Sequence, residues 1–198
     1  MMYPIFILAF QLFASCYGAP TDSRTAQAFL ENRLVPNIIL TAPENFIQVN
    51  YSNIEVNLGN RFNPLQTTSP PRISFDADDN ELYTFVFFGP DLPPARRPPY
   101  TQFLHWLVVN IPGKSLENGD TISSHFPPLP YPGGFPYLFL LYKQNAPIDP
   151  NAFKNLSNIF NRPHFDVINL QDVYKLTGPI AGNFMREVYL PPFSQPSN

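Results

Sequence analysis

Apolar and polar positions follow two different patterns along the chain, and the patterns separate fully buried strands from half-buried ones. Residues 82–88, 103–111 and 137–144 are almost continuously apolar, which predicts central strands buried on both faces. Residues 46–51 and 53–59 alternate instead, as do residues 183–190 near the end of the chain. Alternation of this kind predicts strands with one buried face. The fold class predicted by the pattern is therefore mainly β.

Helical spacing occurs only outside these strands. The apolar residues of the segment 22–34 recur at intervals that predict one short amphipathic helix, ending before Pro36. Two further short helices are predicted over residues 151–160 and 168–178, the second with Asn169 as its N-cap. The helices are few and short, so we expect them to cover the sheet rather than to form the core.

Composition narrows the class of protein. A chain of 198 residues with 44% hydrophobic residues suits one domain with a sizeable core. Charged residues make up 14% and the net charge is −3, so there is no basic surface for nucleic acid or anionic membranes. The 25 prolines outnumber the 9 glycines, which favours stiff turns over flexible ones.

The first segment, residues 1–18, has an apolar stretch, no charged side chain and small residues at its end. This pattern predicts a secretory signal peptide that is cleaved after Gly18, and hence a secreted protein. A membrane anchor is the alternative, but a spanning helix needs about 20 apolar residues. Cleavage would remove Cys16, the only cysteine, and leave no transmembrane anchor in the mature chain. We expect one domain over residues 19–190 and a flexible tail over 191–198.

Two sequons lie in the chain, at Asn50-Tyr51-Ser52 and Asn155-Leu156-Ser157. In a secreted protein, Asn50 and Asn155 are predicted to carry glycans on exposed loops. Such triplets also arise by chance. Glycosylation of both asparagines is therefore conditional on secretion.

The motifs of the common enzyme classes do not occur in this sequence. It has no G-x-S-x-G, no H-E-x-x-H and no phosphate-binding G-x-x-x-x-G-K-[ST]. The three histidines are 20 and 39 residues apart, so no local spacing suggests a zinc site. Four carboxylates between residues 76 and 81 could hold calcium or form a solvated hairpin turn, and we predict the turn. We expect no metal, no cofactor and no catalysis.

Two proline-flanked stretches carry a resemblance to a known family. GPDLPPARRPPYTQFLHWLVVNIPG, residues 89–113, resembles the D-P-D-x-P-S-R signature and the following H-x-x-V-V-N strand of the phosphatidylethanolamine-binding protein family. YPGGFPYLFLLYKQ, residues 131–144, resembles the G-x-H-R-Y signature of that family, and LTGPIAGNF, residues 176–184, resembles a third element. The resemblance covers about residues 36–187.

The resemblance implies a central β-sandwich with a few peripheral helices and a small anion pocket at one end of the large sheet. In the family, a carboxylate and a histidine from the first motif region and a histidine and a tyrosine from the second bind a phosphate-like group. His105 and Tyr137 match this set. The first loop contributes Asp91 and Pro93, and the family's cis-proline bond corresponds to Leu92–Pro93.

Other positions depart from the family pattern. The first aspartate of D-P-D is Gly89, and the His-Arg pair is Phe135-Pro136. The glycine that donates a backbone N–H corresponds to Pro127, which has none. Burial without a nearby carboxylate should keep a histidine neutral. We therefore predict a degraded, more apolar anion pocket formed by the following residues: His105, Tyr137, Asp91, Pro93 and Phe135.

Each of these residues also has a purely structural interpretation. His105 can be a satisfied core histidine, Asp91 can pair with Arg96 or Arg97, and the ring of Tyr137 can simply pack. The predicted function is that of a secreted, non-catalytic binding protein for a small ligand, a lipid head group or a protein partner. The alternative is an extracellular protease inhibitor, because some family members inhibit proteases.

Overall fold

The computed structural model of the chain describes residues 23–90, 101–128 and 134–188. The predicted signal peptide and the predicted tail therefore lie outside the described residues, as do Asp91 and Pro93. Within the described ranges, no helix combines the length and the apolar character that are needed to cross a bilayer.

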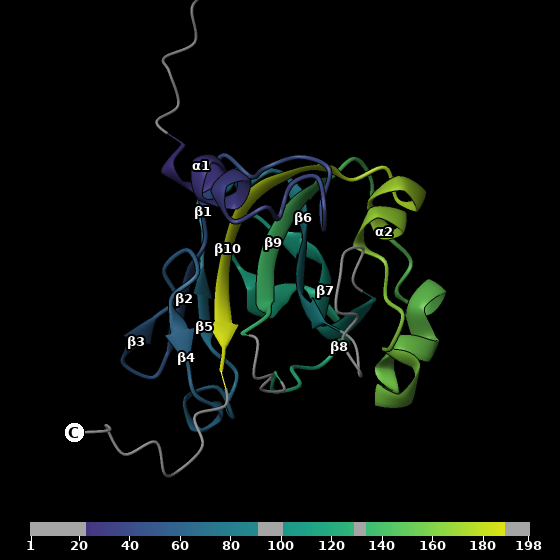
Figure 1. Ribbon diagram of the computed structural model, residues 1–198. Helices are drawn as coiled ribbons and strands as arrows, with labels where there is room; N and C mark the ends of the chain where they lie inside the picture. The colour runs from purple at the N-terminus through teal and green to yellow at the C-terminus, as the bar shows by residue number, and fades with distance from the viewer. Residues whose placement is uncertain (1–22, 91–100, 129–133, 189–198) are drawn as a thin grey trace, which may run out of the picture.

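Two sheets form the centre of the molecule (Figure 1). The larger sheet has the order β1-β10-β9-β6-β7-β8, and β4 pairs with β10 beside β1. The smaller sheet has the order β3-β2-β5. The strands of the large sheet are β1 (Asn45–Phe46), β4 (Arg61–Phe62), β6 (Leu82–Pro90), β7 (Gln102–Pro112), β8 (Asp120–Ser123), β9 (Pro136–Gln144) and β10 (Thr177–Glu187), and those of the small sheet are β2 (Gln48–Tyr51), β3 (Ile54–Glu55) and β5 (Arg72–Ser74).

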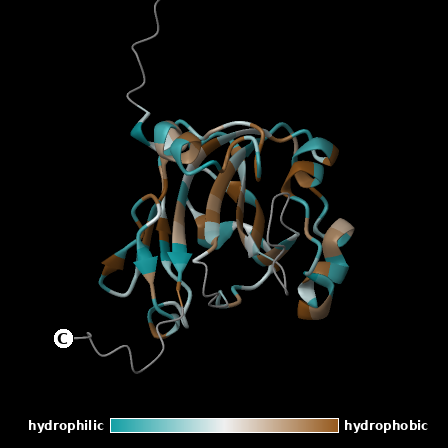
Figure 2. Cartoon of the chain, in the orientation of Figure 1, coloured by the Kyte–Doolittle hydropathy of each residue, from teal (hydrophilic) through white to brown (hydrophobic). Residues whose placement is uncertain are grey.

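Both faces of the large sheet are buried, so the sheet has a core on each side. On the face toward the small sheet, Phe85 and Phe139 of the large sheet form one apolar core with Val49 of the small sheet. The opposite face packs Val86 and Leu140, among others, against residues of the helices. Figure 2 shows the central strands as the most hydrophobic part of the chain. This arrangement confirms the predicted mainly-β sandwich with peripheral helices.

The three continuous apolar runs are confirmed as the central strands β6, β7 and β9. Strand β6 lies between the other two and pairs antiparallel with each. A strand in this position presents alternate side chains to the two cores. The residues on both of its faces therefore have to be apolar. The register sets Phe87 beside both Trp106 and Phe139.

The alternating segment 53–59 was predicted as a strand, and this prediction is wrong beyond β3. Leu58 and Gly59 have φ of 46° and 105°, which turn the chain away from an extended course. The side chain of Asn60 stabilises the turn by accepting a hydrogen bond from the Asn57 N–H at 2.8 Å. A local side-chain bond of this kind competes successfully with a strand ladder.

The helices are α1 (Arg24–Glu31) and α2 (Val167–Val173), with 3-10 turns η1 (Pro64–Gln66), η2 (Leu116–Asn118), η3 (Pro150–Ser157) and η4 (Ile159–Asn161). The segment predicted as a helix over 151–160 thus forms 3-10 turns. The N-cap of α2 is Asp166, whose carboxylate accepts from the N–H groups of Ile168 and Asn169. The predicted cap at Asn169 is wrong, because that residue lies within the first turn.

A fully buried asparagine on β10 holds the small sheet against the large one. Asn183 donates from its side-chain amide to the carbonyls of Ile47 and Val56, each at 2.8 Å. Its side-chain oxygen accepts from the N–H groups of Leu58 and Phe184. All of its polar capacity is used, so the group is buried without an unsatisfied atom.

Candidate ligand site at one end of the large sheet

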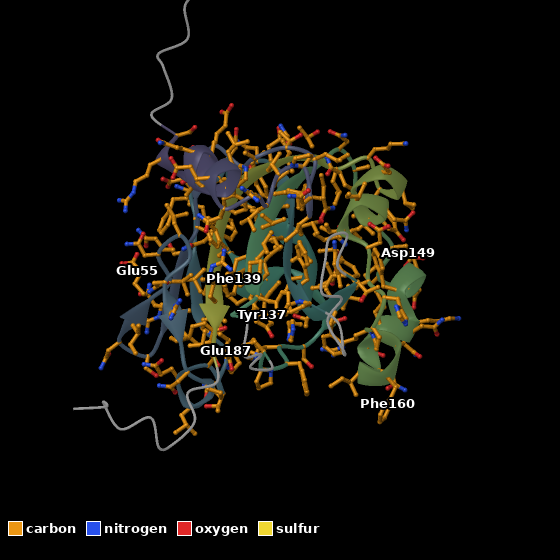
Figure 3. All side chains as sticks on the ribbon, in the orientation of Figure 1. Glu55, Tyr137, Phe139, Asp149, Phe160 and Glu187 are labelled. Atoms are coloured by element: carbon orange, nitrogen blue, oxygen red, sulfur yellow. The ribbon has the colours of Figure 1, made fainter. Side chains whose placement is uncertain are left out.

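One end of the large sheet brings together the segments that the sequence singled out. Strand β6 ends at Pro90 and its partner β7 begins at Gln102, so Gly89 lies opposite Phe103. Strand β9 begins at Pro136, opposite Arg186 of β10. The end of β6 and the starts of β7 and β9 therefore lie at the same end of the sheet. In Figure 3, the labelled Tyr137 and Glu187 lie at this end.

His105 lies on β7 and is almost completely buried, with 1% of its surface exposed. Its Nδ1 lies 2.9 Å from the carbonyl oxygen of Phe126, so this nitrogen carries the proton and donates it. In the neutral ring, no second N–H is left to donate to an anion. Burial lowers the pKa of His105 to about 3. The imidazole is therefore neutral at physiological pH.

Aromatic rings surround this imidazole. The ring centroids of Phe103 and Phe87 lie 4.9 and 5.1 Å from that of His105. Tyr137 meets it edge-on at 5.4 Å. The two site residues that match the family set therefore face each other on the side of the sheet that packs against the small sheet. An apolar cage of this kind opposes a charge at its centre.

Gly89 lies where the family has its first aspartate, and the ring of Tyr137 occupies the space beside it. A Cβ on residue 89 would overlap Cδ1 and Cε1 of Tyr137. Carbon atoms in contact normally stay about 3.5–4.0 Å apart. The tyrosine is itself fully buried. The position thus lacks a carboxylate and has no room for any side chain.

The structure places a second histidine near this site, which the sequence analysis did not select. The ring of His125 stacks on Phe87 at 6.0 Å and meets Trp106 edge-on. Burial lowers the pKa of His125 to about 4, and its Nε2 has no hydrogen-bond partner among the described residues. Twenty residues separate the two histidines in sequence, so spacing alone carried no signal for this proximity.

A buried arginine lies behind both histidines. The guanidinium of Arg162 donates to the carbonyl oxygen of Ser124 at 2.8 Å, and at 3.4 Å to that of His105. It also donates to Leu156 and Ser157 in η3. Arg162 thereby joins β7, the segment after β8 and η3, and its charge helps to keep the pKa values of both histidines low.

The sequence predicts Phe135 in one pocket with His105 and Tyr137, but the structure places it elsewhere. It lines a narrow apolar cleft, with a free volume of about 10 Å³, together with Ile38, Phe88 and Leu138. Those three belong to the core on the helix side of the sheet, whereas Tyr137 belongs to the core on the other side. Phe135 and His105 thus lie at the same end of the sheet but at opposite faces. Among the described residues that line the cleft, Gln102 has the only polar side chain, and its oxygen accepts a hydrogen bond from Val167 N–H.

The remaining polar candidates are placed apart from this end. Asn155 is exposed on η3, whereas Asn50 is half-buried in β2 and pairs with Glu55 and Arg72 on its two sides. Exposure favours Asn155 as a glycan acceptor, and occupancy of both sequons stays a prediction.

The carboxylates of residues 76–81 do not converge. Asp76 pairs with Lys114 and Glu81 with Lys143, while Asp78 accepts from the N–H of Asn80 within the turn. Within the described ranges, no three residues of the metal-binding types gather closely enough to hold an ion. The segment forms the turn before β6.

Comparison with known proteins is consistent with this geometry. Residues 42–173 match the model of the phosphatidylethanolamine-binding protein family. The chain is 33% identical over 169 residues to the putative odorant-binding protein A5 of Drosophila melanogaster, covering 83% of this chain and 80% of that protein. It is 33% identical over 162 residues to the 26 kDa secreted antigen of Toxocara canis, covering 80% of this chain and 62% of that protein.

A solved structure with the same fold is the carboxypeptidase Y inhibitor in complex with its cognate proteinase. The TM-score is 0.70 at 20% sequence identity, and the match covers 87% of this chain and 98% of the inhibitor. At this identity the match supports the fold alone. Together with the family match and the two relatives, it shows that the chain belongs to the phosphatidylethanolamine-binding protein family.

Proposed function

We propose that this chain is a secreted, non-catalytic binding protein whose ligand is a small apolar molecule rather than a phosphate group. The observation that carries the proposal is the packing of Tyr137 against Gly89, where the family has an aspartate. Without that carboxylate, nothing among the described residues offsets the cost of charging His105.

The expected loss of phosphate affinity follows from the hydrogen bonds that cannot form. A hydrogen bond to a charged group contributes roughly 1.5–3 kcal/mol. A neutral imidazole whose N–H is already used by Phe126 cannot form one with phosphate. Losing one or two such bonds corresponds to about ten- to a thousandfold weaker binding.

The apolar cleft beside Phe135 supports a replacement ligand. Its free volume is only about 10 Å³, far below the ~300–1,000 Å³ usual for ligand pockets, so a small ligand enters only by displacing the side chains that line it. Among the described residues its walls are apolar apart from Gln102, whose oxygen is already hydrogen-bonded. The name of the Drosophila relative, a putative odorant-binding protein, points to the same ligand class. The name of the Toxocara relative, a secreted antigen, supports secretion.

Fluorescence titration with the small apolar dye 1-aminonaphthalene tests this proposal. We expect saturable binding that weakens about tenfold or more in Phe135→Ala, because burial of a phenylalanine side chain contributes about 1.5–3 kcal/mol. Phe160→Ala is the matched control, because Phe160 is 85% exposed on η4 and lies away from the cleft. Figure 3 shows Phe160 at the margin of the molecule.

The competing result concerns phosphate. Saturable binding of phosphoethanolamine at low micromolar concentration, abolished in His105→Ala, would contradict the proposal. Equal loss of dye binding in the Phe135 and Phe160 variants would show that the dye binds exposed aromatic surface instead of the cleft.

A second candidate function is inhibition of a protease. Its support is the exposed aromatic side chain of Phe160, since aromatic residues are common anchors in protein interfaces. The fold also occurs in an inhibitor that binds carboxypeptidase Y. Assay of the purified chain against a serine carboxypeptidase distinguishes the candidates. Inhibition that is lost in Phe160→Ala but kept in Phe135→Ala would favour the inhibitor.

A further inference from the structure

A buried carboxylate on β10 has an oxygen without a hydrogen-bond partner. Glu187 has none of its surface exposed, and its Oε2 accepts from the hydroxyl of Thr67 at 2.9 Å. Its Oε1 has no partner among the described residues. An unsatisfied carboxylate oxygen in the interior is costly, so a buried atom of this kind points to a group that completes it.

A second unpartnered oxygen lies on the neighbouring sheet. Tyr51 is 2% exposed, and its hydroxyl also has no partner among the described residues. Burial and the nearby charge of Glu187 both raise the pKa of Tyr51, which therefore keeps its proton. The tyrosine ring packs on Phe62 at 5.7 Å, and Phe62 lies opposite Glu187 in the pairing of β4 with β10. Glu187, Tyr51 and Thr67 form what we call the Glu187 cluster.

An opening lies next to this cluster. A cavity of about 210 Å³ is lined by Tyr51 and by Gln66 and Thr68, the two neighbours of Thr67 in the chain. Ile54 and Leu65 also line it, and both are exposed, at 37% and 85%. The cavity therefore joins a polar inner wall to an apolar rim.

The charged groups around the cluster do not neutralise the carboxylate. Arg61 and Arg72 are exposed on β4 and β5, and no ion pair involving Glu187 occurs in the described part of the chain. Arg186 directs its guanidinium to the carbonyl of Gly134 and to the side chain of Asn32. Burial raises the pKa of Glu187 to about 7, only partly offset by the bond from Thr67. At about pH 8 the carboxylate is ionised and lacks a counter-charge.

We infer that the Glu187 cluster and the cavity beside it form a second binding site, for a primary ammonium group carried on a short alkyl chain. An ammonium group has three N–H donors, which match the free oxygen of Glu187 and the phenol oxygen of Tyr51. The alkyl chain would lie along Ile54 and Leu65. This site is independent of the apolar ligand proposed above, because its side chains come from different residues.

Titration with n-butylammonium chloride at about pH 8, followed by ¹H–¹⁵N NMR of the intact mature chain, tests the inference. We expect saturable shifts at the amides of residues 51–54 and 65–69, with affinity lowered about tenfold or more in Glu187→Gln. Glu55→Gln is the matched control, because Glu55 is exposed on β3 and should leave the affinity unchanged. The glutamine variant keeps the size of the side chain, and its melting temperature reports whether the fold persists.

Three outcomes would overturn the inference. Equal binding of the neutral n-butanol would show that the cavity does not select a cation. Equal affinity in Glu187→Gln would remove the carboxylate from the site. Absence of any saturable shift in the unaltered chain would mean that a bound water completes Glu187 and Tyr51, since a water can also satisfy both oxygens.

Discussion

Alanine at position 89 is expected to destabilise the fold by about 2–3 kcal/mol. The new methyl group would overlap the ring of Tyr137 at Cδ1 and Cε1. The tyrosine is fully buried and packs among Phe87 and His105, so the ring cannot swing aside without disturbing the core. Overpacking of a dense core has this cost. Urea denaturation monitored by tryptophan fluorescence measures it.

A double-mutant cycle with Tyr137 identifies the cause. Tyr137→Ala by itself removes a buried ring and should cost about 3–5 kcal/mol, a value typical of large aromatic truncations. In that background Gly89→Ala should cost less than about 1 kcal/mol, because the obstructing ring is gone. If Gly89→Ala costs the same with and without the ring, the overlap is not the reason for glycine at this position.

The same packing has a consequence for function. Restoring the family aspartate at position 89 requires space that Tyr137 now occupies, so Gly89→Asp alone should destabilise the chain and should not recover phosphate binding. If the proposed function holds, recovery of an anion site requires a change at Tyr137 as well as at position 89.

Arg162→Met is expected to lower the free energy of unfolding by about 3–4 kcal/mol. The side chain keeps its length, but the carbonyls of Ser124, His105 and η3 lose their buried donor. Each buried polar group without a partner costs roughly 1–3 kcal/mol. Arginine serves here because its planar fork reaches several carbonyls at once. Chemical denaturation gives the free energy of unfolding.

Two variants control this experiment. Arg72 is exposed on β5, so Arg72→Met should change the free energy of unfolding by less than about 0.5 kcal/mol. Arg162→Lys retains the charge but fewer donors, so its loss should fall between those of the other two variants. A loss in Arg162→Met no larger than that in Arg72→Met would show that the bonds to the carbonyls contribute little.

The central strands could be predicted from the sequence because their signal is local. Residues buried on both faces have to be apolar at every position, and this leaves a continuous run in each of β6, β7 and β9. The short elements gave weaker signals. Strand β8, Asp120–Ser123, has a polar start and escaped prediction, and the segment after Pro150 formed 3-10 turns in place of a helix. A strand of four residues such as β8 shows too few repeats for a period to emerge, and over the eight residues of η3 the apolar spacing does not separate a 3-10 helix from an α-helix.

The site was only partly predictable. The proline-flanked signatures pointed to His105 and Tyr137, and the structure brings these rings together at 5.4 Å. Phe135 was assigned to the same pocket, yet it lines a cleft at the other face of the sheet. Positions two apart in a strand share a face, so Phe135 would lie with Tyr137 if the strand included it, but β9 begins at Pro136. The first residue of a strand cannot be fixed from sequence.

The sequence by itself determined the mainly-β sandwich and the family, since both follow from which residues occur in order along the chain. Only the tertiary structure decided that the ring of Tyr137 fills the space beside Gly89, that His125 and Arg162 lie by His105, and that one oxygen of Glu187 and the hydroxyl of Tyr51 are buried without a partner among the described residues. Those facts depend on contacts between strands and turns that are distant in sequence. Packing and burial are properties of the folded chain, and they set which groups are charged and which space is free.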